Sequence, residues 1–201
     1  IKMSSITNFV KKRPLATGLI ALGIAAIGYF GYRRYQQIGP HWDSSVNGHK
    51  FHAAITAAKT HNIAQEKTSG TYLTKQSKQH GAYVHSYSAS EYSKMKLFLL
   101  NNGSKKGVAG VAVKNGDIVS VFKHPDCRIK GIVDRYLIPK AIQNGGNRLD
   151  CFDGFLPTLY ARNGFKPVSK MPFNKKFAPP DWNYKRDGTP DIIFMKHTTE
   201  T

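Results

Sequence analysis

The sequence predicts an α/β (α+β) domain with a mixed, mostly antiparallel sheet flanked by helices, preceded by one N-terminal transmembrane helix. Three observations predict this class: an uncharged run near the N-terminus, an alternation of helical and strand patterns after residue 48, and an Asn-Gly pair between two β-rich segments. A chain of 201 residues is long enough for one compact domain and an appendage. The two cysteines exclude a disulfide-dense scaffold and a four-cysteine zinc site.

The appendage is the segment 1–35. No charged residue occurs from Pro14 to Tyr32, and basic residues bracket this run on both sides. As a helix it would be roughly 28 Å long, close to the hydrocarbon thickness of a bilayer, about 30 Å. We therefore expect a single-pass membrane anchor spanning 14–32, a linker at 36–47 and a folded domain at 48–201.

Two properties of the anchor are open from the sequence. Basic residues flank both ends of the span, and their count only slightly favours the N-terminus inside and the domain outside, so the orientation stays open. Thr17, Ala21 and Ala25 form a stripe of small residues, through which two spans could pair in a homodimer.

Periodicity and turn signals predict the elements of the domain in order. A helix is expected from Gly48 to Gln65, because apolar residues recur there at intervals of three and four. Asn115-Gly116 predicts a type I′ hairpin turn, which needs positive φ twice. Gly145 and Gly164 are expected to end helices. The predicted strands are 83–87, 96–100, 108–114, 117–122, 149–152, 165–171 and 191–195, and the later helices are 128–143 and 156–162.

The charge is strongly positive. The chain has 30 Lys and Arg against 12 Asp and Glu, a net charge of +18. Six of these basic residues flank the apolar run, so the remaining 24 still exceed the acidic residues by 12. This excess favours an anionic partner, which could be a phosphate ligand, a nucleic acid or lipid headgroups.

A basic, glycine-containing loop lies between the strand at 117–122 and the next helix. It contains Lys123, Arg128, Lys130 and Gly131. Unpaired backbone N–H groups at a helix start, with the positive end of its dipole, form an anion site. Cys127 in this loop is either a nucleophile or, on the plainer interpretation, a small buried residue.

Two motifs resemble the GNAT superfamily of N-acetyltransferases. The segment Arg128-Ile-Lys-Gly131-Ile-Val133 is similar to its pyrophosphate loop, and Leu159-Tyr160-Ala-Arg-Asn-Gly164-Phe165 is similar to its last helix and strand. Val133 stands where the family has a small residue, and Asp153 and Leu156 depart from its common Asn and Ala. The resemblance covers about 94–196, and the segment after Leu149 also looks like GNAT-like domains of phage and mobile-element proteins.

The resemblance implies acetyl-CoA as the acyl donor and a role for each motif residue. Tyr160 would protonate the thiolate of coenzyme A as it leaves. Backbone N–H groups near Val121, Phe122 and Lys123 would stabilise the oxyanion. The pyrophosphate would be held by the backbone amides of the loop, at Arg128, Ile129, Lys130, Gly131, Ile132 and Val133.

The reaction also needs a base to deprotonate the amine. Asp153 is the first candidate, and the alternative interpretation makes it an N-cap or turn residue. Asp150 and Glu91 are further candidates, while Tyr160 could instead be only a core aromatic residue. Histidines near residue 50 lack an acidic or thiol partner nearby in the sequence, so we expect no metal.

The sequence therefore predicts a membrane-anchored N-acyltransferase that moves an acetyl group from acetyl-CoA to an amine. The positive charge favours an anionic acceptor, such as tRNA, a nucleotide sugar or a protein. Because acetyl-CoA is cytosolic, an active domain would face the cytoplasm. Two alternatives are a catalytically inactive GNAT-like interaction or virion-associated membrane protein, and a basic nucleic-acid-binding membrane protein.

Overall fold

The computed structural model describes residues 39–69, 84–179 and 182–198. Its centre is one seven-stranded sheet with the order β1-β2-β3-β4-β5-β7-β6. Neighbouring strands are antiparallel except β4 and β5, which are parallel. The predicted mixed, mostly antiparallel sheet is confirmed. The strands are β1 (Pro40–Trp42), β2 (Lys96–Asn102), β3 (Lys105–Lys114), β4 (Asp117–Lys123), β5 (Arg148–Phe152), β6 (Phe165–Met171) and β7 (Ile192–His197).

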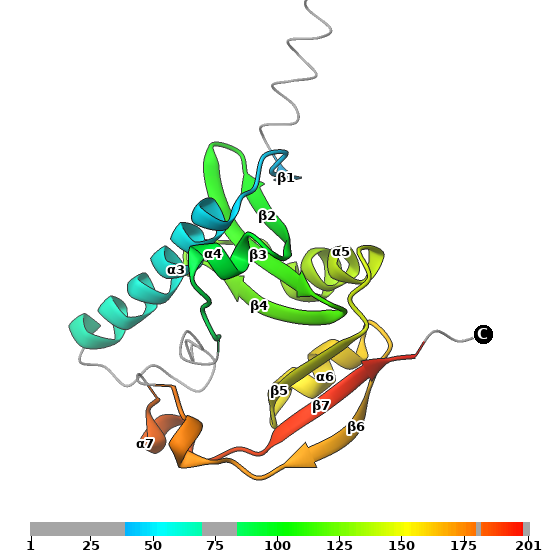
Figure 1. The fold of residues 1–201 in the computed structure, drawn as a ribbon. Coiled ribbons are helices and arrows are strands. Elements are labelled where there is room, and N and C mark those ends of the chain that lie inside the picture. Colours follow the sequence, from blue (N-terminus) through cyan, green and yellow to red (C-terminus); the bar gives the residue numbers. More distant parts are fainter. Residues whose placement is uncertain (1–38, 70–83, 180–181, 199–201) are drawn as a thin grey trace, which may run out of the picture.

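Helices cover both faces of the sheet (Figure 1). The long helix α3 buries Phe51, Ile55 and Ala58 against one face, which confirms the predicted apolar stripe. The opposite face packs against the helix that contains Leu137, Ile138 and Ala141, and against α6. The helices are α3 (Gly48–Ser69), α4 (Ala89–Tyr92), the π-helix η3 (Val133–Leu137), α5 (Ile138–Gln143), α6 (Phe155–Ala161), the 3-10 helix η4 (Lys175–Phe177) and α7 (Tyr184–Asp187).

The hairpin between β3 and β4 has the predicted geometry. Asn115 and Gly116 have φ of 50° and 89°, and Lys114 pairs directly with Asp117. Further along, the register of the two strands shifts between Gly110 and Ala112, where Ser120 on β4 has φ 53°. This β-bulge turns β4 shortly before it reaches the basic loop.

The strands β4 and β5 separate along their length. They pair only at Asp117 and Arg148 in the described chain, and Figure 1 shows them diverging from that point. Arg148 fixes the junction, because its guanidinium donates to the Asp117 carboxylate and to the Asn115 carbonyl. The two halves of the sheet therefore open like a wedge, which we name the β4–β5 wedge.

One predicted strand and one predicted helix start are wrong. Residues 84–87 are not a strand, because their backbone bonds to side chains: the Tyr87 N–H donates to the Tyr92 hydroxyl at 3.2 Å, and the His85 carbonyl accepts from Ser120 at 3.0 Å. The helix expected from Arg128 begins only after Gly131, which has φ 65°, outside the helical region.

The N-terminal part of the domain also differs from expectation. Pro40–Trp42, which we expected in a linker, forms the edge strand β1 and pairs with β2. The predicted span at 14–32 lies outside the described residues. Among the helices that the structure does describe, none has the length and apolar character required to cross a membrane.

Candidate active site

The predicted pyrophosphate loop forms an open pocket of about 390 Å³. Seven of the nine residues expected to bind the cofactor line it: Lys123, Arg128, Ile129, Lys130, Gly131, Ile132 and Val133. The other two lie beside it on β4. Val121 is half-buried against the main core, and Phe122 is buried on the α3 side, so only their backbone could reach a ligand.

The helix start at this pocket has no side-chain cap. The N-cap residue is Ile132, which makes no side-chain capping bond, and the first intrahelical bond runs from the Arg135 N–H to the Gly131 carbonyl. The first N–H groups of a helix have no partner within it, and they attract anions. The exposed side chains of Lys123, Arg128 and Lys130 add positive charge at this point.

Two features of the loop could weaken anion binding: the negative charge of Asp134 and the size of Val133. Asp134 lies in the first turn, but its carboxylate pairs with Arg162 at 3.3 Å and its side chain is only 15% exposed. Val133, which departs from the family pattern, packs its side chain against the main core. It is only partly buried there and also lines the pocket.

The helix beyond the loop is irregular for a local reason. Pro139 has no N–H with which to continue the helical bonding. The turn before it is a π-helix, in which the Ile138 N–H bonds to the Val133 carbonyl five residues back. Asn163 on the following loop donates to the Asp134 carbonyl at 3.1 Å, so this helix is tied to the end of α6.

Tyr160 lies on α6 and is 7% exposed. Burial raises the pKa of its hydroxyl, and the nearby Cys151 and Asp150 raise it further. Within the described part of the chain this hydroxyl makes no hydrogen bond. A buried donor without a partner costs about 1–3 kcal/mol, and such a group can serve a ligand that arrives later.

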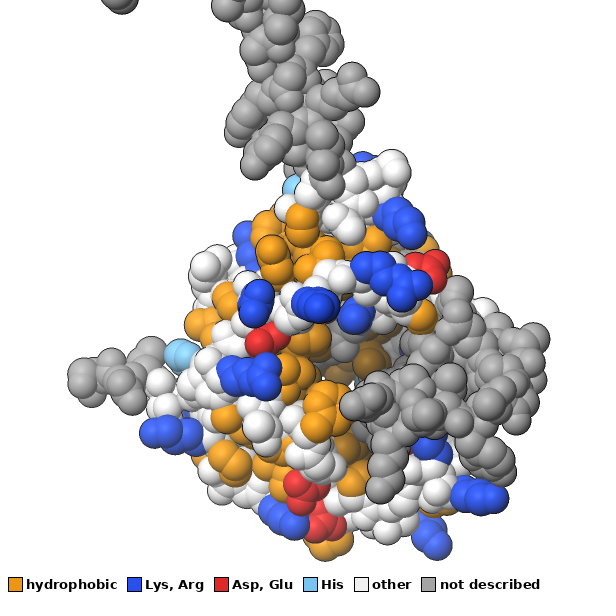
Figure 2. Space-filling view, turned by 180° about the vertical axis from the view of Figure 1, so that it is seen from behind, with side chains coloured by type: hydrophobic (Ala, Val, Ile, Leu, Met, Phe, Trp, Pro, Cys, Tyr) orange, Lys and Arg blue, Asp and Glu red, His pale blue; other side chains and the backbone are white. Residues whose placement is uncertain are grey.

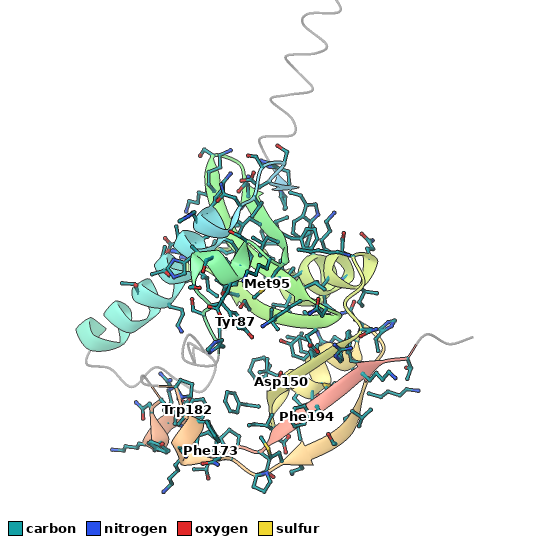
Figure 3. All side chains as sticks on the ribbon, in the orientation of Figure 1. Tyr87, Met95, Asp150, Phe173, Trp182 and Phe194 are labelled. Atoms are coloured by element: carbon teal, nitrogen blue, oxygen red, sulfur yellow. The ribbon has the colours of Figure 1, made fainter. Side chains whose placement is uncertain are left out.

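Asp153 and Asp150 lie in different surroundings. Asp153 follows β5 and is exposed, where its carboxylate accepts from the Gly154 N–H at 2.8 Å and pairs with Lys170 at 3.3 Å. It does not cap α6, whose N-cap is Gly154. Asp150 points into the β4–β5 wedge towards Tyr87 (Figure 3). Partial burial raises its pKa, as does Asp117, while His85 and a backbone N–H lower it.

Sequence reasoning missed the loop at 84–88, in which Tyr87 lies near enough to Asp150 for this carboxylate to raise its pKa. The Tyr92 hydroxyl accepts from the Tyr87 N–H and donates to Ser120 at 2.9 Å, and Ser120 donates to the His85 carbonyl. This chain of hydrogen bonds anchors the loop to the β-bulge of β4. It depends on side chains far apart in the sequence, so no local pattern could have revealed it.

The possible metal ligands and the two cysteines complete the description of the site. Within the described ranges, His, Cys, Asp and Glu do not gather in groups of three or more that could hold a metal. Cys127 is buried beneath the basic loop. Cys151 is also buried, and burial raises its pKa to about 12, so it stays a neutral thiol.

The two motifs that carry the GNAT resemblance meet at one pocket, because Leu159 lines it together with the basic loop. Three solved structures illustrate what this chain is similar to. Apo-form YjaB from Escherichia coli has a TM-score of 0.48 and 13% identity, over 80% of this chain and 99% of that one. Ribosomal-protein-alanine N-acetyltransferase from Brucella melitensis gives 0.46 and 13%, over 79% and 99%. An acetyltransferase of the GNAT family from Staphylococcus aureus gives 0.42 and 8%, over 79% and 98%.

No family model matches the sequence, and no curated protein matches it.

Proposed function

We propose that this protein is an N-acetyltransferase that moves an acetyl group from acetyl-CoA to an amine by direct transfer. The observation that carries the proposal is the pocket at an uncapped helix start, lined by three cations and by Gly131 at positive φ. The pyrophosphate of coenzyme A matches this site in charge, because backbone N–H groups and cations bind phosphate oxygens.

The chain's own residues supply the remaining roles in the reaction. Asp150 accepts the proton that the amine must lose before its nitrogen attacks the thioester carbonyl. Its raised pKa brings the carboxylate closer to the range in which it can act as a base. Backbone N–H groups of β4, near Val121 to Lys123, stabilise the oxyanion. Asp153, held by Lys170, is the second candidate base.

Tyr160 then donates its proton to the leaving thiolate. The new C–N bond forms as the C–S bond breaks, and the thiolate leaves as the thiol of coenzyme A. Because burial raises the pKa of Tyr160, the hydroxyl is protonated at neutral pH and is ready to donate. Its lack of a partner in the described chain leaves that proton available.

Calorimetric titration of coenzyme A into the full chain in detergent micelles tests the proposal. We expect micromolar binding that Arg128→Glu and Gly131→Asp abolish. The matched control is Lys166→Glu, the same charge change on the exposed surface of β6, which should leave the affinity unchanged. If a folded sample does not bind coenzyme A at millimolar concentration, the proposed acetyl-CoA-dependent activity is excluded.

We further propose that residues 14–32 anchor the domain on the cytoplasmic side of a membrane, on the basis of sequence alone. A reporter fused to the C-terminus tests the orientation, and an external reporter would contradict a role with cytosolic acetyl-CoA. The face shown in Figure 2 bears on the nucleic-acid alternative. Several Lys and Arg side chains gather across its upper part, and the others lie apart nearer its edge.

A further inference from the structure

The face of β5 that looks into the wedge combines one carboxylate with aromatic rings. Side chains alternate along a strand, so Asp150 and Phe152 share this face, while Leu149 and Cys151 are buried on the other. Phe194 on β7 pairs directly with Asp150 and is 36% exposed. Directly opposite residues lie about 5 Å apart at their Cβ atoms, so this ring adjoins the carboxylate.

The aromatic wall extends from Phe152 into the segment between β6 and β7. The ring of Trp182 lies 4.6 Å from that of Phe152 and 5.2 Å from that of Phe173. Tyr184 stands edge-on to Phe173 at 6.2 Å and is 46% exposed. The Trp182 indole N–H donates to the Gly188 carbonyl at 3.0 Å, which ties this ring to the backbone of its own segment. Figure 3 shows Asp150 and Phe194 on the same side of the sheet as Phe173 and Trp182.

Three carboxylates lie near Tyr87 although the chain as a whole is basic. Burial is the largest cause that raises the pKa of Tyr87, and Asp150, Tyr92, Glu91 and Asp117 raise it further, in that order. The Lys114 ammonium lies 5.1 Å from the centre of this ring, and the Asp117 carboxylate is paired with Arg148. Of the charged groups that act on Tyr87, Asp150 therefore contributes most.

We propose that the acceptor is a small primary amine that carries an aromatic group, and this inference rests on the proposed function above. Its ammonium would pair with Asp150, and its ring would pack on Phe194 and Phe152. A carboxylate attracts an ammonium directly, and aromatic faces favour a neighbouring cation. An anionic acceptor, which the net charge of the chain favours, would meet the Asp150 carboxylate at the site of transfer and be repelled.

A set of three matched ligands tests the inference by calorimetry on the full chain in micelles. Phenethylamine has both the ring and the ammonium, phenylacetate has the ring with a negative charge, and propylamine has the ammonium without a ring. We expect phenethylamine to bind at least about tenfold more tightly than either of the others, since each lacks one attractive interaction. Asp150→Asn should weaken phenethylamine binding about tenfold, and Phe194→Ala should weaken it about threefold or more. Phe177→Ala, which changes an exposed ring outside the wedge, is the matched control.

Equal or tighter binding of phenylacetate or propylamine to the unmodified chain would overturn the inference, whatever the variants do. So would an Asp150→Asn variant with unchanged phenethylamine affinity. Coenzyme A binding, measured on the same samples, separates the two proposals. Coenzyme A binding without a preference for phenethylamine overturns only the acceptor class, whereas absence of coenzyme A binding overturns the proposed function.

Discussion

Replacing Tyr160 with phenylalanine separates a catalytic role of the hydroxyl from a structural one. The change keeps the ring, which is 7% exposed and part of the main core, so packing should be preserved. It removes a buried hydroxyl that has no hydrogen bond in the described part of the chain. Because an unpartnered buried donor is unfavourable, the free energy of unfolding should stay equal or rise by about 1 kcal/mol.

The same variant should lose most of its activity. A proton donor positioned at the leaving group contributes about 10²–10⁴-fold to the rate. We therefore expect kcat to fall at least about 100-fold, with the affinity for coenzyme A unchanged. Thiol release measures the rate, urea unfolding measures the stability, and Tyr136→Phe on the neighbouring helix serves as the matched control.

The pH dependence of stability gives an independent check on Tyr160. Burial raises the pKa of its hydroxyl in the folded state, so the stability that it contributes is complete below the unfolded value of about 10. That contribution is lost as the pH rises above about 10, and Tyr160→Phe should lack this alkaline loss. A variant that keeps full activity, or one clearly less stable than the unmodified protein, would refute the assignment.

Three further predictions concern the loop at 128–133, the packing of α3 against α4, and the loss of stability at low pH. Gly131→Ala places a side chain at φ 65°, which costs about 1 kcal/mol, and the shift of the loop N–H groups should raise the Kd for coenzyme A about tenfold in calorimetry. Gly48→Ala places a Cβ against the Ala89 carbonyl oxygen, closer than van der Waals contact allows, so urea unfolding should show a loss of about 1–3 kcal/mol in the free energy of unfolding. Asp43 is partly buried, which raises its pKa, but its bond with Lys50 and further hydrogen bonds lower it from 3.8 to about 2. The stabilisation that Asp43 contributes is therefore present above pH 3.8 and is lost as the pH falls towards 2. In an acid titration of stability, the Asp43→Asn variant should not show this loss.

Each of these predictions has an outcome that would contradict it. Unchanged coenzyme A affinity in Gly131→Ala would mean that the loop backbone does not bind the ligand. Unchanged stability of Gly48→Ala would mean that α3 and α4 are not packed as closely as described. If Asp43→Asn and the unmodified protein lose stability equally at low pH, the loss comes from other carboxylates.

Local chemistry determined several elements completely. The Asn115-Gly116 pair determined the hairpin, because only residues that tolerate positive φ make a two-residue turn of that kind. The strand at 165–171 follows Gly164, which ends α6, and its predicted and observed bounds agree. The residues of the predicted pyrophosphate loop, 128–133, are contiguous in the chain, and for that reason they line one pocket, as the sequence predicted.

Tertiary contacts decided the rest, and the acceptor side of the site most of all. Residues 84–87 have the composition of a strand, but the side chains of Tyr92 and Ser120 take the backbone bonds that a strand would need. The side chains of β5 alternate between two faces, and Asp150 lies on the exposed one, as many surface carboxylates do. Only the divergence of β4 from β5 brings it near Tyr87. A two-residue turn is set by the φ angles and hydrogen bonds of adjacent residues, so the sequence alone determined the hairpin. The wedge depends on side chains that meet only when the sheet is assembled, so the tertiary structure alone decided it.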